Sequence, residues 1–163
     1  MFLLDSNTFI EAKNRYYAFD FAPAFWDWLD HVAQDDVRVI EPVCDELGSY
    51  SDELGEWIRS RKGSGWMLSI DDDATQDEYA DIVNELHGSH YKPSAVREFL
   101  SGADPWLIAK AKVLNACVVT HEVAQPEARA RVPIPNICGP KNIPVRNTFE
   151  LIRLKASKFF FKP

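Results

Sequence analysis

Four acidic residues stand at points of the chain where a catalytic site could assemble. Asp5 follows the apolar run FLL, Glu46 lies in the phrase DELG beyond VRVIEP, Asp104 precedes a proline in ADPWLIAKA, and Glu122 follows ACVVT in the phrase VVTHE. Like charges packed together are unfavourable unless a cation lies between them. A fold that gathers these four carboxylates therefore predicts a divalent cation among them.

The chemistry of the donors selects the cation. All four acids are carboxylates, and Ser6, Asn7 and Thr120 offer further hydroxyl or amide oxygens. Oxygen-only sites favour Mg²⁺ or Mn²⁺ over Zn²⁺, and such sites act on phosphate esters, where the ion activates water and neutralises the phosphate. The predicted metal ligands and catalytic residues are Asp5, Asp104 and Glu122, with Glu46 as a further ligand or as a base that orients water.

Each acid also has an ordinary structural alternative. The stretch Asp5-Ser6-Asn7 is typical of a turn after a strand. Asp104 before a proline is a suitable helix N-cap, a role that is compatible with metal binding. Glu46 competes with its neighbours Glu41 and Asp45, and the direction of the helix that carries them decides which one faces the site.

The elements expected to position these residues alternate between short apolar strands and amphipathic helices, which predicts an α/β fold with a central parallel sheet of four to five strands flanked by helices. The expected strands are 2–4, 37–40, 66–70, 116–120 and a final aromatic strand 158–161. Four helices are expected over residues 42–48, 52–61, 94–100 and 104–114, the second of them capped by Ser51. Another helix is expected after Pro23, one is expected to run from a capping box of Asp73 and Gln76 to Gly88, and the last is framed by Asn147 and Glu150. The proline-rich stretch 125–146 is expected to be mostly loop or edge.

The carboxyl ends of parallel strands form one edge of a sheet, and ligands bind beyond that edge. Asp5 and Glu122 follow two such strand ends, while Asp104 and Glu46 lie where helices pass the same edge. The sequence therefore predicts that all four meet there.

Composition predicts one domain that spans residues 1–163. The chain has 163 residues, of which 46% are hydrophobic, enough for a substantial core. No apolar run reaches the ~20 residues that cross a bilayer, and Asp5 interrupts the first apolar run. The three cysteines are widely spaced and form no C-x-x-C pair, so they support neither a disulfide framework nor a cysteine zinc site. We expect a cytoplasmic protein that does not engage a membrane.

Charge is distributed unevenly along the chain. The net charge is −7, but residues 1–123 carry 10 Lys+Arg against 23 Asp+Glu, whereas residues 124–163 carry 8 against 2. The basic residues that follow the last acid, Arg129, Arg131, Lys141 and Arg146, are predicted to hold the phosphates of a nucleic-acid strand. The competing role for this stretch is docking of a partner protein.

Further substrate contacts are expected at the mouth of the site. The leading candidates closely follow the first acid and are Lys13, Arg15, Tyr16 and Tyr17. Asn7, Thr120 and His121 flank the acids themselves. A histidine at such a place binds phosphate when protonated, or it caps a turn.

The phrases FLLDSNTFI, VCDELG, ADPWLIAKA and VVTHE resemble the PIN-domain nucleases, among them the VapC-like toxins. The longer phrases IEAKNRYYAFDFAPAFWDWL, ADPWLIA, VVTHE and IPNIC are similar to a prokaryotic PIN-like family of unknown function, DUF4411, over nearly the whole chain. The resemblance implies a Rossmann-like parallel sheet, metal-dependent endoribonuclease activity on RNA, a cognate antitoxin as partner, and a homodimer. The last acid departs from the common PIN pattern, because Glu122 stands where aspartate is usual. The alternative is a catalytically silent PIN-like module that binds protein or RNA.

Overall fold

The structure is a computed structural model, and it describes residues 1–155. Its centre is a five-stranded sheet in which every pairing is parallel and the strand order is β3-β2-β1-β4-β5. The strands are β1 (Phe2–Leu4), β2 (Val37–Ile40), β3 (Met67–Leu68), β4 (Cys117–Val119) and β5 (Val145–Arg146). The predicted parallel α/β sheet is therefore confirmed, with the first strand of the chain in the middle.

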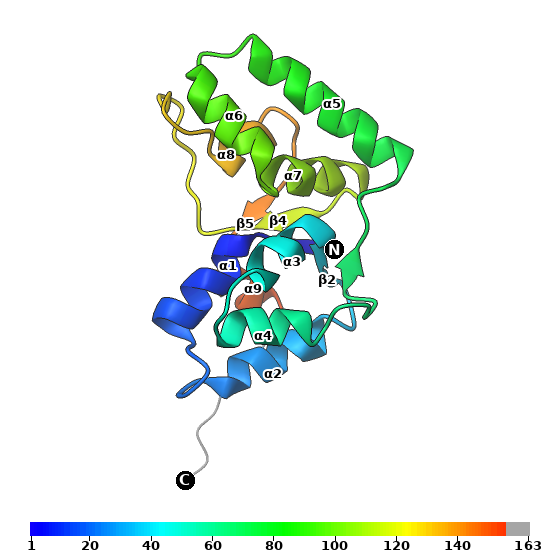
Figure 1. Cartoon of the computed structure of the whole chain (residues 1–163), viewed down its shortest axis with the longest axis vertical. Coiled ribbons are helices and arrows are strands. Elements are labelled where there is room, and N and C mark those ends of the chain that lie inside the picture. The colour runs from blue at the N-terminus through cyan, green and yellow to red at the C-terminus, as the bar shows by residue number, and fades with distance from the viewer. Residues whose placement is uncertain (156–163) are drawn as a thin grey trace.

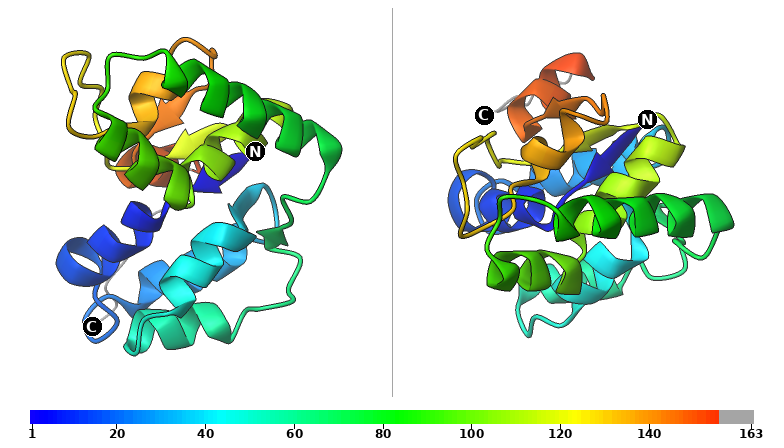
Figure 2. Two further views of the ribbon diagram at one scale, coloured as in Figure 1. Left: turned by 45° about the horizontal axis from the view of Figure 1, so that its top comes forward. Right: turned by 90° about the horizontal axis from the view of Figure 1, so that it is seen from above.

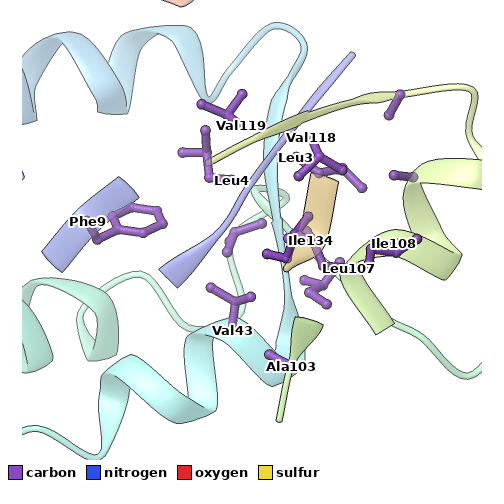
Figure 3. Packing of buried hydrophobic residues seen from close by; sticks show 14 of the residues in the cluster. Leu3, Leu4, Phe9, Val43, Ala103, Leu107, Ile108, Val118, Val119 and Ile134 are labelled. Carbon is purple, nitrogen blue, oxygen red and sulfur yellow. The ribbon is translucent and has the colours of Figure 1, made fainter. Parts of the chain in front are cut away.

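The central strand is buried because the sheet is covered on both faces. Leu3 pairs in register with Val118 of β4, and both side chains are fully buried. Figure 3 shows these two residues packed near Leu107 and Ile108 of a helix and near Ile134 of another. Continuous apolar runs such as FLL and CVV are typical of strands that are buried on both faces.

Helices lie on both sides of the strands. In Figures 1 and 2 the segments α5 to α8 gather on one side, and α2, α3 and α4 lie on the other. The helical elements are α1 (Ser6–Glu11), the π-helix η1 (Ala12–Tyr16), α2 (Pro23–Val32), α3 (Glu41–Gly48), α4 (Glu53–Arg59), α5 (Asp73–His87), α6 (Pro93–Ser101), α7 (Asp104–Val113), α8 (Ile134–Cys138) and α9 (Thr148–Leu154). Among residues 1–155, no helix combines the length and apolar character needed to cross a bilayer.

Three predicted helix caps differ in the structure. The N-cap of α4 is Asp52, whose carboxylate accepts a hydrogen bond from the Gly55 amide, and not Ser51. The N-cap of α5 is Asp72, not Asp73. These two aspartates accept hydrogen bonds from the third residue into their helices, which is the usual capping geometry.

The third difference concerns the helix that begins at a site acid. Asp104 is the first residue of α7, and the preceding residue, Ala103, occupies the cap position without a side-chain cap. Pro105 then stands in the first turn, where its missing N–H costs nothing. The Asp104 carboxylate is therefore not committed to capping.

The proline-rich stretch is more ordered than the sequence predicts. It contains α8 and β5, and β5 pairs in parallel with β4, so this stretch forms an edge of the sheet. The final helix, α9, begins at the two residues predicted to frame it, and they form a capping box in which Asn147 accepts from the Glu150 amide and Glu150 accepts from the Asn147 amide. The π-helix η1 was not predicted. The predicted strand 158–161 lies outside the described residues.

Candidate active site

The first acid lies at the carboxyl end of the central strand. Asp5 is 1% exposed, and its Oδ2 accepts a hydrogen bond of 2.7 Å from the Thr120 hydroxyl, which lies just beyond the end of β4. Its carboxylate makes no capping hydrogen bond to α1. Burial raises the pKa of Asp5 to about 6, an effect that the Thr120 hydrogen bond opposes and the charge of Glu122 increases. The side chain thus faces the neighbouring strand end, where the Thr120 hydroxyl holds it.

The last acid is joined to the first through one hydroxyl. Thr120 Oγ1 donates to Asp5 and accepts from the Glu122 backbone N–H at 3.1 Å. The Glu122 carboxylate itself accepts a hydrogen bond of 2.7 Å from the Ile134 backbone N–H, at the start of α8. The apolar strand β4 and the threonine that follows it therefore place Glu122 near Asp5, and the first amide of α8 holds the Glu122 carboxylate.

The charges of the other three acids all act on the carboxyl group of Asp104. It begins α7, and burial, followed by the charges of Asp5, Glu122 and Glu46, raises its pKa to about 8. A carboxyl in this position binds a proton near neutral pH unless a cation balances the neighbouring charges. The four predicted acids, which come from distant parts of the chain, are electrostatically coupled at the carboxyl edge of the sheet.

Glu46 reaches the site from α3. Its Oε2 accepts a hydrogen bond of 3.0 Å from the hydroxyl of Ser6, the residue that follows the first acid. Its neighbour Asp45 instead pairs with Lys62 at 3.0 Å, and Glu41 is exposed in the first turn of the helix. Among the three acids of α3, Glu46 is the one joined to the Asp5 segment.

Small hollows line this edge. Asp104 and Glu122 share a hollow of about 250 Å³, and Arg131 also lines it. A second hollow of about 210 Å³ is lined by Asn7, Glu11, His121, Glu122, Val123 and Arg131. Glu46 lines a third, of about 480 Å³, on the far side of Gly102. Asp104, Glu122 and Glu46 therefore each line a hollow, whereas the buried Asp5 lines none of those described.

The carboxylates do not converge on one point. In the part of the chain that the structure describes, no three side chains of His, Cys, Asp or Glu are close enough together to hold one ion. The sequence predicts a tighter cluster, and the difference has a physical cause. Like charges separate, and Thr120, Ser6 and the Ile134 amide each hold one of the carboxylates by a hydrogen bond.

The donor set nevertheless fits a hard cation. Every group is an oxygen donor, as Mg²⁺ and Mn²⁺ prefer, and the carboxyls with raised pKa values are those that a cation would relieve most. Binding of one ion by Asp5, Asp104 and Glu122, with Glu46 beside them, would require these carboxylates to move closer together.

Several predicted substrate residues lie at this edge. Asn7, His121 and Arg131 line the same hollow as Glu122, and Thr120 lines the next one. Burial lowers the pKa of His121, and its Nε2 lies 2.8 Å from the Thr148 hydroxyl.

Other predicted cations are engaged elsewhere. Lys13 pairs with the cap residue Asp52 at 2.5 Å, and it lines none of these hollows. Arg15 is largely exposed and pairs with Glu11 at 3.1 Å, near the rim. Arg129 is exposed, and its side chain lines no hollow described here.

Lys141 also differs from its predicted role. Its ammonium, on a side chain only 10% exposed, lies 2.8 Å from Glu78 and 2.9 Å from Glu85 on α5. The contact with Glu78 is an ion pair without a hydrogen bond, because Glu78 Oε1 has no hydrogen-bond partner among the described residues. Lys141 therefore fastens the loop to α5 and does not face the acids.

Three features of the site were not predicted. The Ile134 amide that holds Glu122 is invisible in a pattern of side chains. Glu11, the last residue of α1, lines the hollow of His121 and Arg131. Rings from three distant segments meet beside Glu122, and only the fold brings them together.

The largest hollow described, about 590 Å³, lies away from the acids. Its lining includes Arg38, Arg61 and Trp66, near the amino ends of β2 and β3. Arg61 pairs with Asp30, and Arg38 donates to the backbone carbonyls of residues 33 and 37. We call the carboxyl edge of the sheet that carries Asp5, Glu46, Asp104 and Glu122 the acidic edge. Its carboxylates, and not the volume of a hollow, identify it as the candidate active site.

Comparisons with solved structures support this fold. VapBC2 from Rickettsia felis, in a crystal structure described as bound to a DNA fragment from their promoter, matches with a TM-score of 0.56 and 14% identity over 90% of this chain and 97% of that one. FitAcB from Neisseria gonorrhoeae matches with a TM-score of 0.53 and 21% identity over 91% and 99%. A search of curated proteins by sequence finds no match. The profile of one family covers residues 2–159, and the chain belongs to that family, the Domain of unknown function DUF4411.

Proposed function

We propose that this protein is an Mg²⁺- or Mn²⁺-dependent endoribonuclease that hydrolyses phosphodiester bonds of RNA. The observation that supports the proposal is the placement of Asp5, Glu46, Asp104 and Glu122 along the carboxyl edge of a parallel sheet, where the charges of the other three act on Asp104. The likeness to the two PIN-like structures supports the fold that such a site requires. RNA as substrate rests on the family resemblance of the sequence phrases.

Different residues of the chain would have different roles in this reaction. Thr120 orients the Asp5 carboxylate through its 2.7 Å hydrogen bond, so that the buried acid keeps one geometry. Arg131, which lines the hollow of Asp104 and Glu122, would hold a substrate phosphate beside them. A bound Mg²⁺ or Mn²⁺ would supply Lewis-acid neutralisation of the phosphate and activation of water. Asp104 would give up its proton when the ion balances its neighbours.

We further propose that a cognate antitoxin silences the enzyme by covering the acidic edge. The sequence resemblance implies a toxin of a toxin–antitoxin pair, and a homodimer is part of the same expectation. A partner found by co-expression should protect RNA from cleavage by the parent protein, and it should bind less tightly to a variant in which Arg131 is replaced at the edge.

The second candidate, a silent binding module, is favoured by a specific observation. Three of the four carboxylates already accept hydrogen bonds from within the chain, at 2.7 to 3.0 Å. A module whose acids serve only to join segments would bind RNA or protein without cleaving it.

Cleavage of a labelled single-stranded RNA by the purified protein separates the two. The enzyme should cut with Mg²⁺ or Mn²⁺, and should not cut with chelator or as the Asp5→Asn variant. The matched control is Asp77→Asn, which removes an exposed charge from α5 and should cut like the parent. Cleavage that survives Asp5→Asn, or no cleavage with either metal, would contradict the proposal.

A further inference from the structure

A hollow of about 320 Å³ adjoins the acidic edge on the side of α9. Its lining includes Glu122 and His121 after β4, Arg146 of β5 and Phe149 of α9. This volume is at the small end of ligand pockets. Because Glu122 belongs both to this hollow and to the one that contains Asp104, an occupant would lie next to the acids.

Aromatic rings from three segments form a group that we call the ring cluster: Tyr16, His121 and Phe149. His121 and Phe149 line the hollow, and Tyr16 contacts both of these rings. The Tyr16 and His121 rings are stacked at 6.0 Å with an interplanar angle of 26°. Phe149 meets Tyr16 edge-on at 5.0 Å and His121 at 5.8 Å. Tyr16 remains 42% exposed although it is a large apolar ring.

The ring cluster is held in place before any ligand arrives. The His121 ring is fixed by its 2.8 Å contact with the Thr148 hydroxyl. Phe149 lies inside the capping box that starts α9, so its backbone position is set by two reciprocal hydrogen bonds. Such preorganisation lowers the entropic cost of binding a flat ligand.

The charge of the hollow indicates the kind of ligand. Arg146 is exposed, donates to its neighbour's carbonyl, and pairs with no carboxylate in residues 1–155. Glu150 also lines the hollow, but its carboxylate is used by the Asn147 amide. Rings beside an unpaired guanidinium are the combination that binds a base and its phosphate in single-stranded nucleic acid.

We propose that this hollow binds one nucleotide of single-stranded RNA next to the phosphodiester bond presented to the acids, with the base stacked on Phe149 and His121 and a phosphate held by Arg146. The inference deepens the proposed function and rests on it for the identity of the strand. It predicts contact with bases, whereas the basic residues of the loop predict contact with phosphates alone. Stacking tolerates any base, so no sequence preference follows from the ring cluster itself.

The test compares an eight-nucleotide oligouridylate with an abasic strand of the same length and charge. Binding is measured by fluorescence anisotropy in the Asp5→Asn background, so that cleavage does not interfere. We expect the base-bearing strand to bind about 5- to 100-fold more tightly, because base–aromatic stacking has that range of effect. Phe149→Leu, which keeps apolar bulk but removes the ring, should abolish most of this preference.

Phe21→Leu is the matched control, since Phe21 is 66% exposed and lines no hollow described here, and it should leave the preference unchanged. Thermal unfolding of each variant shows whether the fold is retained. If Phe149→Leu does not fold, Tyr16→Ala, at the exposed ring, is the second variant that should reduce the preference for the base-bearing strand. A preference that is absent in the parent, or equal in parent and both ring variants, overturns the proposal. If the parent does not cleave RNA but still prefers the base-bearing strand, the proposed function is refuted and the nucleotide site is supported.

Discussion

Replacing Asp104 by asparagine should stabilise the metal-free protein, because it removes the carboxyl group whose pKa is raised most in the site. Burial and the charges of Asp5, Glu122 and Glu46 raise the pKa of Asp104 from 3.8 to about 8. The folded state therefore binds a proton more tightly than the unfolded chain does. By linkage, this carboxyl favours unfolding increasingly as the pH rises from about 4 to about 8, and the effect is constant above that.

The magnitude follows from the size of the shift. Each pKa unit corresponds to ~1.4 kcal/mol, so ionisable Asp104 costs the folded state ~4 kcal/mol at pH 7 and ~6 kcal/mol at pH 9 relative to a neutral side chain. Asparagine is neutral and nearly isosteric, and no capping hydrogen bond is lost, since the Asp104 side chain makes none. The variant should therefore be more stable than the parent by these amounts, and equal to it near pH 3.

Urea unfolding in chelator across pH 4 to 9 measures the difference. The gap between Asp104→Asn and the parent should open with pH, while Asp77→Asn, at an exposed site on α5, should stay within ~0.5 kcal/mol of the parent throughout. Added Mg²⁺ should stabilise the parent more than the variant, because the variant lacks one ligand. A gap that does not change with pH, or a variant less stable than the parent at pH 8, would refute the electrostatic account of this site.

Three further predictions concern residues around the acids. Thr120→Val removes the hydrogen bond that lowers the pKa of Asp5, so the acid limb of the cleavage rate against pH should move to higher pH; an unchanged profile would show that Thr120 does not orient the acid. Arg131→Ala should weaken binding of single-stranded RNA and flatten its salt dependence by about one unit, whereas Arg129→Ala, outside the hollows, should have little effect; the reverse order would place the strand elsewhere. Lys141→Ala should lower the free energy of unfolding by ~1–3 kcal/mol, because two glutamates of α5 lose their cation, and should leave RNA binding intact; chemical denaturation and anisotropy test both parts.

The parallel sheet and its first and last acids could be predicted because local signals agree with the fold. The runs FLL and CVV are uninterrupted, which is typical of strands buried on both faces, and Asp5 and Glu122 follow those runs within a few residues. Their separation in space is then set by parallel pairing of β1 with β4. The structure joins them through Thr120, as that pairing requires.

Choices among equivalent neighbours could not be predicted in the same way. Any residue of Asp71-Asp72-Asp73 is a good N-cap, and Asp72 takes the role while Lys110 of α7 pairs with it at 2.5 Å. That contact joins positions 38 residues apart, so no local pattern contains it. The same holds for Lys141, whose neighbours in sequence give no sign of the glutamates that bind it.

The ring cluster shows a third kind of limit. Tyr16 lies in a π-helix, His121 in the turn after β4 and Phe149 in α9. A π-helix closes wider turns than an α-helix and is rarely recognisable from sequence. It determines where the tyrosine ring lies, so the cluster could be found only once the backbone was known.

The segment between Glu122 and Ile134 is fastened at both ends. Ile134 donates to the Glu122 carboxylate, while the Asn136 side chain bonds both the amide and the carbonyl of Gln125 and also the Tyr91 hydroxyl. A chain tied in this way can be lengthened at its exposed tip without moving its ends, since doubling a flexible loop adds only ~0.6 kcal/mol of closure entropy. An insertion in this segment would keep the acidic edge unchanged only if it also spares Arg131, which lines the hollow of Asp104 and Glu122, and the Arg129 carbonyl, which accepts a hydrogen bond from the Lys92 amide.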